Sequence, residues 1–150
     1  MNIIFLCHGN ICRSVMAEYI FKDILEKNGL LDKFNVVSRA TSREEIGNDI
    51  YPKSKEVLKK NNIKFDRHYA KQITYEEYLN ADYVLAMEEF NIDNLKWIIR
   101  SVDRNKVLLL RNWSKGNKEI SDPWYSGCFE QAYNEIYEGC IDFLKNVVFN

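Results

Sequence analysis

The chain has 150 residues, of which 46% are hydrophobic and 29% are charged, an ordinary composition for one globular domain. Its formal net charge of −1 gives no bulk positive field for nucleic acid. Its first apolar run is too short for a secretion signal or for a membrane span, which needs about 20 apolar residues. We therefore expect a single domain, residues 1–150, that resides in the cytoplasm and binds neither nucleic acid nor membrane.

Patterns typical of strands and helices alternate along the first half of the chain. The apolar run at 2–6 predicts a buried strand, and a helical spacing of apolar residues follows from Ser14 until Gly29 ends it. A second strand is predicted at 34–38 and a second helix at 53–62. These segments have the lengths of ordinary strands and helices in globular proteins.

The alternation continues through the second half. A capping-box pattern that begins at Thr74 predicts the start of a short helix. A strand at 82–87 is followed by a helix at 90–100, and a last strand at 106–110 precedes a helix at 129–148. The apolar residues of this final helix form one stripe, so one face of it should be buried.

Strands that alternate with helices favour right-handed crossovers and a parallel sheet. We predict an α/β fold: a single domain with a four-stranded parallel sheet, helices on both faces, and a ligand-binding loop after the first strand. Ligands of such folds bind beyond the carboxyl ends of the strands, and the first strand leads directly into Cys7.

The loop after the first strand has the spacing Cys-x5-Arg-Ser, from Cys7 through Arg13 to Ser14. Backbone N–H groups of a loop that enters a helix can surround an anion, and the helix dipole adds to the attraction. Gly9 and Asn10 suit the tight or left-handed backbone of such a loop, and Arg13 offers a planar fork for phosphate oxygens. We expect phosphate to be bound by Arg13 together with His8, Gly9, Asn10, Ile11, Cys12 and Ser14.

The same surroundings should favour Cys7 as a thiolate, because positive charge lowers the pKa of a cysteine from about 8.5 to roughly 3.5–7.5. Ser14 is placed to hydrogen-bond that thiolate. Taken alone, the spacing also fits a buried cysteine at a strand end with an incidental arginine, because short motifs recur by chance. The four cysteines are unevenly spaced and resemble no zinc site, so we expect free thiols and no metal.

Further motifs accompany this loop. After C-H-G-N-I-C-R-S comes x-M-A-E, and later come Ala40-Thr-Ser, Glu45-Ile-Gly-Asn48, His68-x-Ala-Lys-Gln-Ile-Thr74, Met87 and Asp122-Pro-Trp-Tyr125. In order and spacing they resemble the low-molecular-weight protein tyrosine phosphatases over nearly the whole chain. The resemblance implies hydrolysis of phosphotyrosine through a phosphocysteine on Cys7, with Arg13 as the phosphate clamp and without a cofactor.

The resemblance also implies that Asp122 is the general acid and base of the reaction. Pro123 stiffens the backbone next to it, which suits a fixed catalytic carboxylate, although an Asp-Pro pair alone is typical of a turn. Glu44, Trp124 and Tyr125 are implied to form walls of the cleft, and Tyr125 to be open to phosphorylation. Core packing is the other interpretation of the two aromatic residues.

Supporting roles follow from the same resemblance. Asn10 is implied to be strained and held by hydrogen bonds from Ser14, Ser38 and His68. Cys12 is implied to form a reversible disulfide with Cys7 under oxidation, which would protect the nucleophile.

The chain departs from the pattern at a few positions. Val15 stands where the family often has proline, Arg39 where it has a small residue, and Lys71 where it has arginine. Arg43 and Glu44 replace a glycine and an aromatic residue in the loop that forms one wall of the cleft. We expect substrate preference to be affected there and the chemistry to be retained.

The expected partner is a phosphotyrosine-containing protein or a small aryl phosphate, with inhibition by phosphate-like oxyanions, and the expected state is a monomer or weak dimer. Three alternatives stay open. An arginine phosphatase of the same fold resembles this chain but has threonine in place of Ile11. An arsenate reductase needs a cysteine pair in the middle of the chain, where this sequence has none. A non-catalytic phosphate-binding module would have no need of Cys7, Arg13 and Asp122 together.

Overall fold

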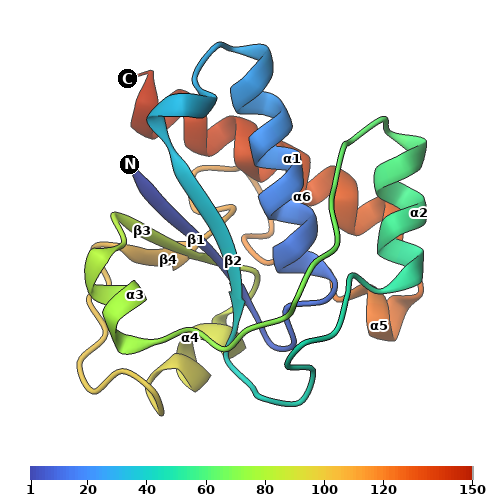
Figure 1. The fold of residues 1–150 in the computed structure, drawn as a ribbon. Helices are drawn as coiled ribbons and strands as arrows, with labels where there is room; N and C mark the ends of the chain where they lie inside the picture. Colours follow the sequence, from blue (N-terminus) through green and yellow to red (C-terminus); the bar gives the residue numbers. More distant parts are fainter. Residues whose placement is uncertain (150) are drawn as a thin grey trace.

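The computed structural model describes residues 1–149, and its centre is a four-stranded parallel sheet in the order β2-β1-β3-β4 (Figure 1). This confirms the predicted α/β fold; the predicted domain range extends to residue 150, which lies outside the described residues. β1 pairs with β2 in register from Asn2 opposite Asn35 to Cys7 opposite Ala40, so the first strand runs one residue beyond the prediction. The strands are β1 (Asn2–Cys7), β2 (Asn35–Ala40), β3 (Tyr83–Ala86) and β4 (Val107–Leu109).

Helices occupy the predicted positions, with differences at their ends. The fourth stops at Leu95 because the chain turns there, where the prediction continued to residue 100. The capping box at Thr74 is formed in full. Two short segments, α5 and η1, have too few residues for a periodic pattern and were not predicted. The helices are α1 (Arg13–Lys27), η1 (Leu31–Lys33), α2 (Pro52–Lys60), α3 (Tyr75–Asn80), α4 (Glu89–Leu95), α5 (Pro123–Ser126), α6 (Phe129–Phe143) and the π-helical η2 (Leu144–Val148).

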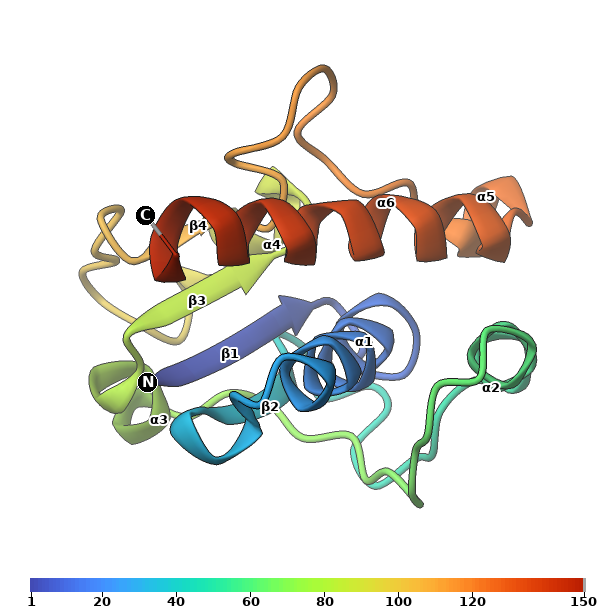
Figure 2. The same cartoon turned by 90° about the horizontal axis from the view of Figure 1, so that it is seen from above.

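The two faces of the sheet are covered by different helices, as Figure 2 shows from above. Side chains of β1 alternate between the faces, because successive residues of a strand point in opposite directions. Ile3 and Phe5 belong to the core shared with α1 and α6, whereas Ile4 and Leu6 belong to the core shared with α3 and α4. Both faces of the central strand are therefore buried, which explains why its sequence is a continuous apolar run.

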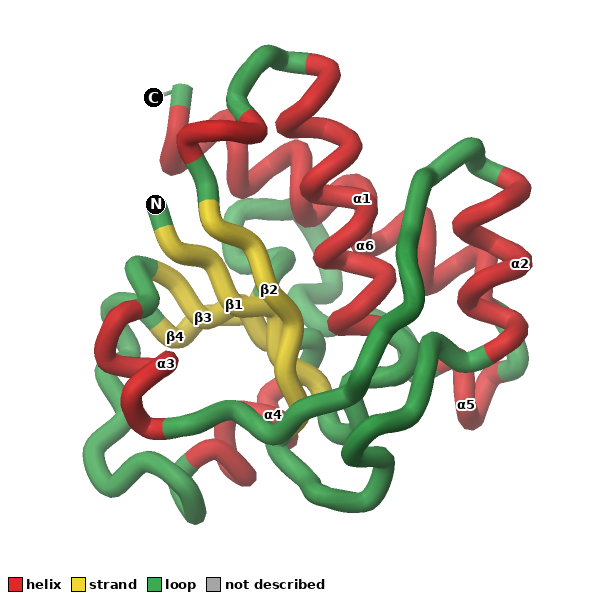
Figure 3. Tube along the Cα trace, viewed as in Figure 1, coloured by secondary structure: helices red, strands yellow, loops and turns green. Residues whose placement is uncertain are grey.

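Two long loops lie side by side at the carboxyl end of the sheet, seen as neighbouring green segments in Figure 3. The loop after β2 bonds to the loop after α2 in both directions: Gly47 N donates to Ala70 O (2.8 Å) and Ala70 N donates to Asn48 O (2.9 Å). Together they form a support beside the loop that follows β1. None of the described helices combines the length and apolar character needed to cross a membrane.

The core between α1, α6 and the sheet is centred on the ring of Phe21. It is fully buried and packs edge-on against Phe5 (5.7 Å between centroids), Phe34 (5.8 Å) and Phe143 (5.8 Å). Phe21→Ala should lower the free energy of unfolding by about 3–5 kcal/mol, because it leaves a cavity among these rings. Phe149→Ala, at a 58% exposed residue, is the control and should change it by less than about 0.5 kcal/mol. Denaturant unfolding of both variants measures the difference, and similar losses would contradict this view of the core.

Candidate active site

Cys7 ends β1 and begins a loop that enters α1 at Arg13. The thiol is buried: it lies 2.9 Å from Ser14 Oγ, to which it donates, and Asn10 N donates to its sulfur at 3.3 Å. Ser14 Oγ also accepts a hydrogen bond from Asn10 Nδ2 (2.9 Å), so its own hydrogen remains available for the sulfur. When Cys7 loses its proton, Ser14 can therefore donate to the thiolate.

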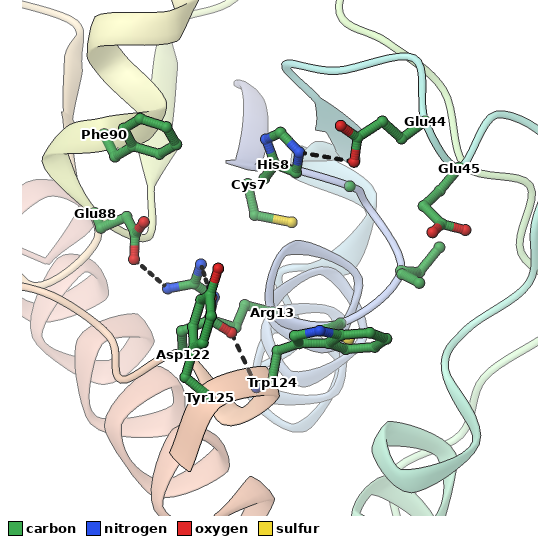
Figure 4. A pocket seen from close by; sticks show the side chains of 13 residues that line it. Cys7, His8, Arg13, Glu44, Glu45, Glu88, Phe90, Asp122, Trp124 and Tyr125 are labelled. Atoms are coloured by element: carbon green, nitrogen blue, oxygen red, sulfur yellow. Dashed lines mark hydrogen bonds and ion pairs between the residues drawn. The ribbon is translucent and has the colours of Figure 1, made fainter. Parts of the chain in front are cut away.

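Beside this sulfur lies a cavity of about 550 Å³. It brings together the three residues predicted to be catalytic with the predicted wall residues and part of the loop. Asn10 and Ser14, also predicted to bind phosphate, are fully buried behind the cavity and support the loop from inside. The lining residues are Cys7, His8, Gly9, Ile11, Cys12, Arg13, Glu44, Glu45, Glu88, Phe90, Asp122, Trp124 and Tyr125 (Figure 4).

The loop takes its shape from Asn10, whose φ of 61° lies in the left-handed region. Non-glycine residues seldom adopt this conformation, and asparagine tolerates it better than most. Every polar group of the side chain is used: Nδ2 donates to Ser14, and Oδ1 accepts from Lys71 N at 3.1 Å. Its carbonyl oxygen lies 2.6 Å from His68 Nε2. The predicted contacts of Ser14 and His68 with Asn10 are thus present in the structure.

The predicted contact from Ser38 to Asn10 is wrong. The buried Ser38 hydroxyl donates instead to Glu18 Oε1 (2.7 Å), and the other oxygen of Glu18 accepts from Lys22 Nζ (2.6 Å). Ser38 points from β2 toward α1, so it holds the helix that follows the loop instead of the loop itself. The spacing of residues along the sequence did not show that the carboxylate of Glu18 is the partner of Ser38 in place of Asn10.

His68 supports Asn10 as a neutral ring. Burial lowers the pKa of His68 from its ordinary value, and only a ring nitrogen that carries hydrogen can bond the carbonyl of Asn10, so Nε2 is the donor. Asp49 Oδ1 accepts from His68 N (2.9 Å), while Asp49 Oδ2 pairs with Lys55 (2.6 Å) and Arg67 (3.2 Å). Asp49, which was not predicted, therefore fixes the segment that carries the histidine.

Arg13 is held in place from one side. Its Nη1 donates to Glu88 Oε2 (2.9 Å) and to the carbonyl of Ile120 (2.9 Å), and its Nη2 lies 3.6 Å from Asp122 Oδ2. Burial disfavours the charge of this guanidinium, but Cys7, Glu88 and Asp122 more than offset it, so the pKa of Arg13 is raised. Glu88 was missed by the sequence analysis; its place after the third strand, where ligands of this fold bind, was the available signal.

Asp122 is the N-cap of α5, and its Oδ1 accepts from Trp124 N at 3.0 Å. This bond directs the other oxygen, Oδ2, toward Arg13 and the cavity (Figure 4). A carboxylate fixed at one oxygen and directed into the cavity at the other is suited to transferring a proton there.

The aromatic wall consists of exposed residues, so core packing is the wrong interpretation for them. Trp124 is 58% and Tyr125 88% exposed, and both line the cavity. Trp124 meets the ring of Tyr51 edge-on (4.9 Å between centroids), and Tyr51 stacks on Phe129. Tyr51 N also donates to Ile11 O (2.9 Å), so this residue, which was not predicted, joins the wall to the loop.

The opposite rim is formed by the loop after β2. Glu44 Oε2 lies 3.1 Å from His8 Nε2, and Glu45 lies next to it along the rim. Cys12 also faces the cavity; burial and the nearby Cys7 raise its pKa to about 12, so Cys12 stays a thiol at neutral pH. Both cysteines are free thiols in this structure.

The lowered pKa of His68 leads to a prediction for stability. Because the unfolded chain binds the proton more tightly, the free energy of unfolding should be highest above about pH 7 and fall as the pH drops through the unfolded-state pKa of about 6.5. His68→Gln should remove this part of the pH dependence, although it lowers stability at every pH. Urea unfolding between pH 5 and 8 measures the slope, and an unchanged slope in the variant would refute the assignment.

Comparison with known proteins agrees with this geometry. The sequence model described as "Low molecular weight phosphotyrosine protein phosphatase" matches residues 2–149. A protein of that name from Schizosaccharomyces pombe is 34% identical, with 97% of this chain and 94% of the relative covered. The low molecular weight protein-tyrosine-phosphatase YfkJ of Bacillus subtilis is 32% identical, with 98% and 96% covered.

Solved structures give the same result. The crystal structure of YfkJ from Bacillus subtilis matches with a TM-score of 0.92 over 98% of this chain and 94% of that one, at 32% identity. A structure titled as a Drosophila arginine phosphatase matches with a TM-score of 0.88 at 29% identity, covering 99% of this chain and 98% of that one. The matched range, residues 2–149, includes the loop from Cys7 to Arg13, the carboxylate of Asp122 and the residues that form the walls of the cavity. The chain belongs to the low molecular weight phosphotyrosine protein phosphatase family.

Proposed function

We propose that this protein hydrolyses phosphotyrosine in proteins through a phosphocysteine on Cys7. The observation that carries the proposal is the meeting of Cys7, Arg13 and Asp122 at one cavity: Cys7 and Arg13 come from the two ends of the loop after β1, and Asp122 comes from a segment far along the chain. Each has the surroundings its role requires: a thiol beside a hydroxyl donor, a guanidinium held from one side, and a carboxylate fixed at one oxygen.

In the first step the Cys7 thiolate attacks phosphorus, and the bond from phosphorus to the tyrosyl oxygen breaks. The charge of the phosphate is balanced by the backbone N–H groups of residues 8–13, by the N-terminus of α1 and by Arg13. Arg13 is bound to the protein chiefly through Nη1, so its other nitrogens can face the phosphate. Asp122 gives its proton to the departing tyrosyl oxygen.

In the second step water attacks the phosphocysteine, and Asp122, now ionised, takes the proton from that water. The bond from sulfur to phosphorus breaks, and Cys7 leaves as a thiolate that Ser14 stabilises by donating its hydrogen. Both steps use the same carboxylate in opposite directions, which is consistent with its fixed position at the edge of the cavity.

The walls of the cavity support an aromatic substrate. Trp124, Tyr125 and Phe90 present flat apolar faces beside the phosphate loop, which suits the phenyl ring of tyrosine. Small aryl phosphates should therefore also be substrates, and phosphate-like oxyanions should be competitive inhibitors. We place the protein in the cytoplasm, because a reducing compartment keeps a thiol nucleophile free. The balanced charge composition of the chain favours a monomer or weak dimer.

The deciding experiment compares matched phosphotyrosine and phosphoarginine peptides, without added metal, for the intact protein and Cys7→Ser. Release of phosphate from phosphotyrosine that Cys7→Ser abolishes supports the proposal. Release chiefly from phosphoarginine would assign the protein to the activity named for the Drosophila structural relative. No release from either by a folded protein would refute hydrolysis.

Removal of the acid should slow the reaction in a way that depends on the leaving group. Asp122→Asn should lower kcat on phosphotyrosine peptide by about 10²–10⁴-fold, because general acid catalysis is typically of this size. The loss should be smaller for an aryl phosphate with an acidic leaving group, which departs without a proton. Asp32→Asn, at an exposed residue outside the cavity, is the control. Equal losses on both substrates would contradict the role of Asp122.

Glu88 should act by positioning Arg13. Glu88→Gln keeps the size of the side chain but weakens the charged hydrogen bond to Nη1, so we expect kcat/KM to fall roughly tenfold, consistent with the strength of such bonds. The matched control is Glu89→Gln at the neighbouring position. Glu89 lies outside the cavity, and its Oε1 pairs with Nη2 of the exposed Arg104 at 3.4 Å. Inhibition by phosphate should weaken in the Glu88 variant alone; equal behaviour of both variants would exclude the positioning role.

A further inference from the structure

Two carboxylates stand at the mouth of the cavity beside the first residues of the phosphate loop. The Glu44 side chain is 70% exposed and faces His8 at 3.1 Å. Glu45 packs against the loop itself, since its Cγ would lie 3.4 Å from a Cβ placed on Gly9. Figure 4 shows both on the same side of Cys7, with Phe90 and Glu88 on the other side of the cavity.

The charges that line the cavity do not cancel at this rim. The cavity as a whole is lined by four carboxylates, those of Glu44, Glu45, Glu88 and Asp122. The basic groups that line it are the guanidinium of Arg13 and the imidazole of His8. Glu88 and Asp122 are the partners of Arg13, which lies at the base of the cavity and is buried. The two rim carboxylates are therefore outside this buried ion pair.

The groups that contact the rim carboxylates are weak partners. Glu44 faces the imidazole of His8, which carries a full charge only when protonated. Glu45 Oε2 accepts from the neutral amide of Asn48 at 2.6 Å. Arg43, the cation of the same loop, bonds Gln72 at 3.3 Å and does not line the cavity. The rim thus presents negative charge to whatever extends beyond the bound phosphate.

We propose that Glu44 and Glu45 make this cleft select phosphotyrosine that is flanked by lysine or arginine, and discriminate against flanking aspartate or glutamate. The inference rests on the proposed function, because it concerns the polypeptide that carries the phosphotyrosine. The phosphate is matched by the loop and Arg13, so the rim acts on the neighbouring residues of the substrate. Phe90 and Tyr125, which line other parts of the cavity, are uncharged, so charge selection comes from this rim.

The size of the effect follows from the exposure of these groups. Exposed ion pairs are each worth about 0.2–1 kcal/mol and are weakened by salt. With attraction for one peptide and repulsion for the other, we expect kcat/KM at low ionic strength to be roughly 3- to 10-fold higher for a lysine-flanked peptide than for a glutamate-flanked one. In about 0.5 M salt the ratio should approach one.

The test uses three phosphotyrosine peptides that differ only in the two residues next to the phosphotyrosine, which are lysine, serine or glutamate. The full-length protein is compared with Glu44→Gln, Glu45→Gln, the double variant, and Glu76→Gln on α3. Glu76 is exposed, lies outside the cavity and has the same charge, so it controls for net charge. The expected result is a lysine-over-glutamate ratio that falls stepwise to about one in the double variant and stays unchanged in Glu76→Gln.

Two results would overturn the inference: a ratio that the double variant does not change, or a preference for glutamate in the unaltered protein. If no peptide is hydrolysed, the proposed function fails and binding decides the inference separately. Titration of the same peptides into Cys7→Ser measures their affinities with and without the rim substitutions. Tighter binding of the lysine peptide that requires Glu44 and Glu45 would support the rim as the selecting surface, and equal affinities would refute it.

Discussion

The site depends on the left-handed turn at Asn10. A loop that wraps its N–H groups around one anion must reverse sharply, and the structure stabilises an uncommon backbone conformation to achieve this. Ser14, Lys71 and His68 each bond Asn10, so the helix after the loop and a segment from the middle of the chain fix the turn together. The thiol and its hydroxyl partner take their positions from this turn.

The second requirement is electrostatic. Cys7 and a phosphate group are both negative when they react, so positive charge must be concentrated in a buried place. Arg13 supplies it, and Glu88 and Asp122 stabilise its burial. Glu88 would oppose a dianion if it faced it, but it bonds the Nη1 side of the guanidinium. Asp122 does face the cavity, and in the proposed first step it carries the proton that it gives to the leaving group, so it adds no negative charge there. Orientation and protonation therefore decide whether each acidic group helps or hinders.

Much of this arrangement was readable from the sequence because it is local. The alternation of apolar patterns predicted the sheet and its helices, and the strand, loop and helix around Cys7 are consecutive in the chain. Asp122 was found only because its motif resembles a family. Tyr51 was missed because its role arises from contacts between distant segments, which no spacing reveals. Glu88 was missed although its position after the third strand was a signal, because its contact with Arg13 joins two distant segments. Ser38 was assigned the wrong partner for the same reason: Glu18, on another element, takes its hydrogen bond.

The position of β1 at the centre of the sheet has a consequence for synthesis of the protein. β1 is made first, yet it pairs with β2 on one side and with β3, about half the chain later, on the other. Its Phe5 face is covered by α6, the last long helix. Contacts of such sequence separation form slowly, so β1 has to wait for segments that are synthesised well after it. The thiol of Cys7, at the end of β1, can take its buried position only when these distant segments have folded onto the sheet.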